Sequence, residues 1–127
     1  MSTTAINILL LVTAVALASG GQLSMKAGML KVGEVTREEL SDFKGLVIRV
    51  VKSHWVVIGV LMFAVSAVFW LLVLSRVKLS IAYPMIAAGY VVVVFFSWLL
   101  LGERVTRIGW LGLILIVAGV IVTAQGL

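Results

Sequence analysis

Four long stretches without a single acidic or basic residue leave this chain of 127 residues little choice of fold. They cover residues 1–25, 53–75, 79–102 and 108–127. Each supplies the roughly 20 residues that a helix needs to cross a membrane, whereas a barrel strand needs only about 9–11. The sequence predicts an all-α integral membrane protein, one domain over 1–127, with four transmembrane helices at about 4–30, 55–74, 79–101 and 108–125. Although Ala16-Leu17-Ala18 fits a signal cleavage site, the first basic residue is Lys26, so we expect an uncleaved first helix.

The sequence argues against enzymes, because no nucleophile, base and orienting group are visible together, and against nucleic-acid binding. Hydrophobic residues make up 63% of the chain and charged residues 12%, against roughly 45–50% and about 25% in soluble domains. Cysteine is absent, and the lone His54 stands beside Trp55 at a predicted membrane edge, so we expect no metal and no cofactor. The net charge of +5 comes from basic residues that border the apolar stretches, which favours membrane lipids over nucleic acid as partners.

The first loop is the only substantial one. Within it, Thr36 and Glu39 have the spacing of a helix capping box. Apolar residues then recur at helical spacing, namely Leu40, Phe43, Val47 and Val50. We expect a short amphipathic helix lying on the membrane surface; the alternative is a solvated linker.

The basic residues are unevenly divided between the two sides of such a four-helix protein. The side with loops 1 and 3 carries eight of them: Lys26, Lys31, Arg37, Lys44, Arg49, Lys52, Arg104 and Arg107. The side with loop 2 and both termini carries only Arg76 and Lys78. The positive-inside rule therefore predicts cytoplasmic loops 1 and 3 and a single orientation.

Several motifs resemble the drug/metabolite transporter superfamily, and within it the small four-helix flippase subunits of the ArnE/ArnF type. The matching elements are "GQL..K" at Gly21, Gln22, Leu23 and Lys26, "WLLVL" at 70–74, "IAYPM" at 81–85, and Glu103 with Val105 and Trp110. The resemblance covers all four predicted helices but not the first loop. It implies transport, without enzymatic activity, of an undecaprenyl-phosphate-linked sugar across the bacterial inner membrane, by a homodimer or by a heterodimer with a paralogous subunit.

The chain resembles the small multidrug resistance exporters more distantly, and here it departs from the pattern. Those exporters carry a membrane-embedded glutamate in helix 1 that binds protons and cationic drugs. Alignment on Met25-Lys26 puts Ala18 at that position, and none of the four apolar stretches contains an acid.

The end of the first helix instead offers chemistry for an anion. Gln22 and Lys26 are four residues apart, so they share a helix face and can together bind a lipid phosphate. The alternative is that Lys26 only extends to the interface. Glu103 can pair with Lys26, cap the fourth helix, or pair with Arg107.

Aromatic and hydroxyl side chains extend this candidate substrate site. Tyr83 and Tyr90 are seven apart on the third helix, and Ser66 and Trp70 share a face of the second. Such side chains can hydrogen-bond a sugar while presenting an apolar body to a lipid chain; the alternative is ordinary packing between helices. Pro84, the only proline, predicts a kink beside them.

Two glycines mark a candidate interface. Gly112 and Gly119 are seven apart, so they lie on one face of the fourth helix, where small residues let another helix approach closely. This face is either a dimer interface or a packing surface inside the same bundle.

The function that the residues and the resemblance favour is translocation of a polyprenyl-phosphate-linked sugar or related lipid carrier. One alternative is a small-molecule or multidrug exporter, which needs a cation site that the sequence does not contain. The other is a non-transporting accessory membrane subunit.

Overall fold

The computed structural model describes residues 2–126, and within them the chain is built from helices. Four helical stretches in this part are long and apolar enough to span a membrane. They are α1 (Thr3–Val32), α4 (His54–Leu74), the pair α5 (Leu79–Met85) and α6 (Ala87–Leu100), and α7 (Arg107–Ala124). The predicted all-α membrane fold is thus confirmed.

The first loop forms two short helices where one was predicted. Thr36 caps α2 (Arg37–Ser41) with the complete capping box, its hydroxyl accepting from the Glu39 amide. The helix stops at Asp42, whose side chain accepts from the Gly45 amide and so starts α3 (Phe43–Lys52). An aspartate in this role favours a new helix start over continuation of the old one.

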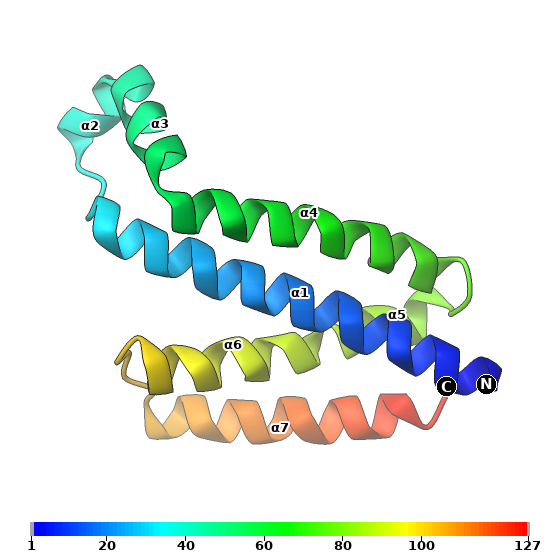
Figure 1. Ribbon diagram of the computed structural model, residues 1–127. Coiled ribbons are helices and arrows are strands. Elements are labelled where there is room, and N and C mark those ends of the chain that lie inside the picture. The colour runs from blue at the N-terminus through cyan, green and yellow to red at the C-terminus, as the bar shows by residue number, and fades with distance from the viewer. Residues whose placement is uncertain (1, 127) are drawn as a thin grey trace.

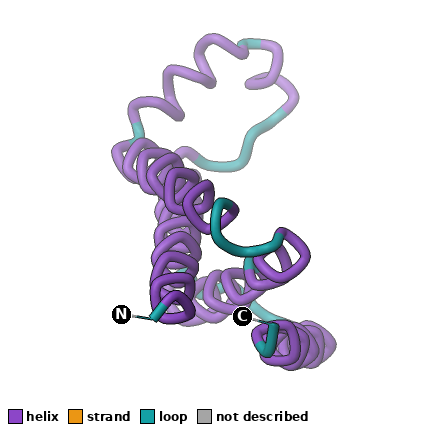
Figure 2. The backbone as a smooth tube through the Cα atoms, turned by 90° about the vertical axis from the view of Figure 1, so that its right-hand side faces the viewer, coloured by secondary structure: helices purple, strands orange, loops and turns teal. Residues whose placement is uncertain are grey.

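The spanning helices form an open row. Figure 1 shows α4, α1, α6 and α7 in that order from top to bottom, and the end view in Figure 2 shows α7 set apart at the edge. α1 packs against both α4 and α6, whereas α7 packs chiefly on α5 and α6. The helix α1 is therefore the centre of the molecule, and α7 covers only one flank.

Glycines allow α1 to approach its neighbours closely. A Cβ atom placed on Gly21 would lie 2.6 Å from the backbone oxygen of Gly59 on α4, and a Cβ on Gly59 would meet the Gly21 oxygen in turn. On the α6 side, a Cβ on Gly89 would lie 3.0 Å from the Ser19 hydroxyl. In a bilayer, where burial of apolar surface hardly drives helix association, such close backbone contact supplies much of the attraction.

Polar contacts fix the two ends of the α1–α4 pair. The Ser24 hydroxyl donates to the Trp55 carbonyl at 2.6 Å, near the end that carries the first loop. At the other end, the Arg76 guanidinium donates to the Asn7 side chain at 2.8 Å. A small apolar core of Leu11, Val73, Val77 and Ala82 lies at this second end.

The third spanning segment is interrupted two residues after Pro84. Ile86 separates α5 from α6, and its amide bonds to the Tyr83 carbonyl three residues back. Pro84 has no amide hydrogen to donate to the Ser80 carbonyl, so the helix is weakened just before this tighter turn. The interruption is confined to this one residue, which keeps helical backbone angles (φ −57°, ψ −30°), and residues 79–100 still form one spanning segment.

We expect Gly59→Ala to lower the free energy of unfolding by about 1–3 kcal/mol, because the new methyl group would press against the α1 backbone. Gly112→Ala is the matched control, since a Cβ there has no heavy atom within 4 Å. Alanine favours a helix over glycine by about 1 kcal/mol, so the control should be neutral or stabilising. Denaturation of both variants in the same detergent checks this, and equal stability would contradict the close contact.

The structure also puts the basic loops together. In Figure 1, α2, α3 and the α6–α7 loop lie at one end, and the α4–α5 turn lies at the other with both N and C.

Because the chain has no cysteine, single cysteines can report on which side of the membrane each loop lies. We expect Lys44→Cys to react with an impermeant maleimide from the cytoplasmic face only, and Ser75→Cys from the opposite face only. The reverse pattern would contradict the orientation predicted from the charges, and reaction of both from both faces would mean dual insertion.

Candidate functional site

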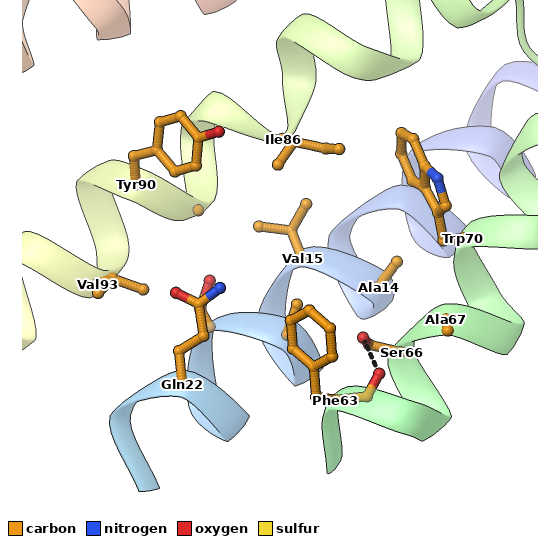
Figure 3. Close-up of a pocket in the computed structure, with 13 residues that line it drawn as sticks. Ala14, Val15, Gln22, Phe63, Ser66, Ala67, Trp70, Ile86, Tyr90 and Val93 are labelled. Atoms are coloured by element: carbon orange, nitrogen blue, oxygen red, sulfur yellow. Dashed lines mark hydrogen bonds between the residues drawn. The ribbon is translucent and has the colours of Figure 1, made fainter. Parts of the chain in front are cut away.

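A partly open cavity of about 330 Å³ lies between α1, α4 and α6. Its lining includes four residues that the sequence proposed for a substrate site: Gln22, Ser66, Trp70 and Tyr90. Figure 3 shows Gln22 and Tyr90 on neighbouring helices, with Trp70 at the far end of the same space. The remaining lining residues are mostly apolar. In the described chain, no residue of α7 lines the cavity.

The polar groups of the cavity differ in their freedom to bind a ligand. The Ser66 hydroxyl donates to the Phe63 carbonyl one turn earlier, as the dashed line in Figure 3 marks. Within residues 2–126, no hydrogen bond engages the side chains of Gln22, Trp70 or Tyr90. An amide, an indole N–H and a phenol therefore remain available inside an otherwise apolar space, the usual make-up of a ligand site.

Lys26 and Glu103 form an ion pair at 3.3 Å, outside the lining of the cavity. About half of each side chain is exposed. Exposed pairs of this kind contribute only about 0–1 kcal/mol to stability in water, so either partner can exchange it for another ligand. Lys26 follows Gln22 by four residues, which is about 6 Å along the helix axis, so the pair lies beyond Gln22 toward the basic loops.

The pairing decides among the three roles considered for Glu103. Thr106, not Glu103, caps α7, since its hydroxyl accepts from the Gly109 amide. Within the described chain, Lys26 is the one cation within ion-pair distance of Glu103.

The structure separates Tyr83 from Tyr90. Tyr83 lies on α5, is 62% exposed and does not line the cavity, whereas Tyr90 on α6 does. Seven residues correspond to two turns only in a regular α-helix, and the three-residue hydrogen bonds at Ile86 interrupt that regularity between the two tyrosines.

Gly112 and Gly119 take no part in packing within the described chain. A Cβ on either would meet no heavy atom within 4 Å, in contrast to Gly21, Gly59 and Gly89. Of the two roles considered for this face, packing inside the bundle finds no support here. The face remains available to a second subunit.

Sequence reasoning missed several residues that build the cavity. Ser19 precedes Gln22 by three residues and is buried in the α1–α6 contact, and Phe63 precedes Ser66 by three. The helical spacing of three or four residues, which joined Ser66 to Trp70, would have found them. The spacing of seven that singled out Gly112 and Gly119 also relates Gly21 to Gly28, both of which lie against α4.

Residues 3–125 match the EamA-like transporter family, and the chain belongs to this family. With four helices able to span a membrane, it is a multi-pass membrane protein. Among residues 2–126 there is no group of three or more His, Asp or Glu side chains that could hold a metal ion.

The chain is also similar to curated bacterial proteins. It is 36% identical over 66 residues to a probable 4-amino-4-deoxy-L-arabinose-phosphoundecaprenol flippase subunit ArnE of Pectobacterium atrosepticum, covering 52% of this chain and 58% of that protein. It is 35% identical over 68 residues to the ArnE subunits of Salmonella paratyphi B and Salmonella newport, covering 54% of this chain and 61% of each. The matches thus span about three fifths of the relatives' length. No solved structure matches the chain.

We expect the double change Gly112→Leu and Gly119→Leu to weaken self-association or association with a paralogous subunit at least tenfold, because leucine prevents close backbone approach. Val117→Leu on the same helix adds bulk outside the glycine face and serves as the control. Crosslinking yield in membranes is the measurement. A yield that matches the control would show that the glycine face is not the interface.

Proposed function

We propose that this chain is one subunit of a transporter that moves a polyprenyl-phosphate-linked sugar, or a related lipid carrier, across the bacterial inner membrane. The observation that carries the proposal is the cavity between α1, α4 and α6. It combines unengaged polar side chains with an apolar lining, and a lysine lies one helical turn beyond it.

Lys26 is the proposed phosphate ligand. A partly desolvated ammonium needs a counter-charge, and Glu103 supplies one at 3.3 Å when no substrate is bound. An arriving lipid phosphate takes the place of the carboxylate, and Gln22 on the same face of α1 donates an amide hydrogen bond to it. Because the resting ion pair is half exposed, breaking it costs little.

The sugar and the lipid tail need different surroundings. Tyr90 and Trp70 offer hydrogen-bond donors and aromatic faces that suit a sugar ring. The isoprenoid tail remains in the bilayer through the open side of the cavity. α7 does not line the cavity, so a second subunit completes part of the wall and leaves a lateral opening for the tail. The similarity to proteins called flippase subunits supports the same arrangement.

An exporter of organic cations would need a different site. Neutralising a cation within the membrane calls for a carboxylate, and the cavity lining includes no Asp or Glu. The chemistry of the lining therefore favours an anionic headgroup over a cationic drug.

Ligand binding separates these functions. We expect the purified chain to bind a polyprenyl-phosphate-linked sugar saturably, with quenching of Trp70 fluorescence, and not to bind tetraphenylphosphonium. Lys26→Ala should weaken binding about 10–100-fold, since a hydrogen bond to a charged group contributes about 1.5–3 kcal/mol. Lys26→Arg should retain part of the affinity, because the charge remains while its shape changes.

Lys44→Ala is the control, because it removes an equal charge from α3, away from the cavity. A Trp70→Phe background identifies the fluorescence signal. Wild-type affinity in Lys26→Ala would make Lys26 an interfacial anchor only. Binding of tetraphenylphosphonium in preference to the lipid would favour the exporter. Binding with no translocation, even in proteoliposomes that hold a partner subunit, would favour an accessory role.

A further inference from the structure

A second concave surface, separate from the transport cavity, lies where α1 ends, α3 ends and α4 begins. This basic groove has a volume of about 360 Å³ and is lined by Lys31, Val32, Arg49, Lys52, Ser53 and His54. Lys31 follows Lys26 by five residues, which is about 140° around the helix, so the two lysines lie on different faces of α1. The groove therefore does not share the proposed phosphate ligand of the transport cavity.

A hydrogen-bond network around Arg49 ties together the elements that meet at this shallow groove. Its guanidinium donates to Glu39 at 2.7 Å and to the Val32 carbonyl at 2.6 Å, which fastens α3 to α2 and to the end of α1. The hydrogen bond from Arg49 holds the pKa of the Glu39 carboxyl below its usual value, so this carboxylate is ionised at neutral pH. Arg49 is thus neutralised within the protein.

The two lysines of the groove are not neutralised. Within residues 2–126, neither Lys31 nor Lys52 has an ion pair, although Lys31 lies 5.6 Å from the centre of the Trp55 ring. The first turn of α4 adds the partial positive charge of a helix N-terminus. The groove therefore presents about two unopposed positive charges beside His54, which favours an anion.

The position of the groove indicates where that anion comes from. The groove lies at the end of two membrane-spanning helices, next to Trp55, and tryptophan is enriched at the headgroup level of membranes. The neighbouring helix α3 runs steeply away from the α4 axis in Figure 1. It exposes Phe43 and Val51, which are 67% and 61% accessible. Apolar side chains next to lysines are typical of a helix that lies in the membrane interface.

We infer that the basic groove binds the phosphate of an anionic phospholipid, through Lys31 and Lys52, and thereby holds the α2–α3 segment on the membrane surface. Arg49 and Glu39 fix the groove's shape, and the exposed face of α3 contacts the acyl chains of the same leaflet. The inference does not depend on the substrate of the transport cavity.

Native mass spectrometry of the purified full chain tests this with phosphatidylglycerol and phosphatidylcholine as the two probes. The groove variant is Lys31→Gln with Lys52→Gln, and the matched control is Arg37→Gln with Lys44→Gln. Both remove two positive charges, but the control residues do not line the groove. We expect the preference for phosphatidylglycerol to fall at least fivefold in the groove variant and less than twofold in the control.

Two further measurements keep the test decisive. If the double variant does not fold, Lys52→Gln alone replaces it, because the Lys52 side chain is exposed and makes no hydrogen bond in the described chain; a loss of about twofold is expected. Inorganic phosphate added in large excess should not displace the lipid. An equal loss in groove variant and control, no loss in either, or displacement by inorganic phosphate would each overturn the proposal.

Discussion

The contact between α1 and α4 at Gly21 and Gly59 is the constraint on which the other features depend. Each glycine lies against the backbone of the other helix, so close that even a Cβ atom at either position would clash with that backbone. This contact sets how far Phe63, Ser66 and Trp70 lie from Gln22, and so determines the width of the cavity. In a bilayer, where lipid competes equally for apolar side chains, a pair of small residues specifies the register of two helices better than larger residues can.

The central position of α1 follows from small residues on two of its sides. Gly21 and Gly28 lie against α4, while Ser19 lies against Gly89 of α6. A helix with close contacts on two sides holds its neighbours apart, which is why a space remains between α4 and α6. The cavity is therefore a consequence of helix packing, and its polar groups lie on the same three helices as the packing residues.

The sequence predicted the spanning helices because uncharged stretches of this length have few other stable forms in a membrane. The Thr36–Glu39 capping box was predictable because it is local. Whether Tyr83 shares a face with Tyr90 was not predictable, because it depends on the turn at Ile86, and residue spacing alone does not predict the geometry of that turn. Gln22, Ser66, Trp70 and Tyr90 could be proposed from residue type, but their convergence depends on which helices α1 contacts. The sequence places Lys26 and Glu103 on the same side of the membrane, but only the structure shows the Lys26 Nζ and Glu103 Oε1 atoms within ion-pair distance.

The unequal lengths of the outer helices have a consequence for the surrounding lipid. α4 has 21 residues and α7 has 18, which correspond to about 32 Å and about 27 Å, on either side of the roughly 30 Å of an average hydrocarbon core. The row therefore has a thicker hydrophobic edge at α4 and a thinner one at α7. Lipids beside α7 must compress, at a cost of a fraction of a kcal/mol per Å of hydrophobic mismatch. Covering α7 with protein relieves this deformation, so the bilayer itself favours association at the edge where Gly112 and Gly119 are uncovered.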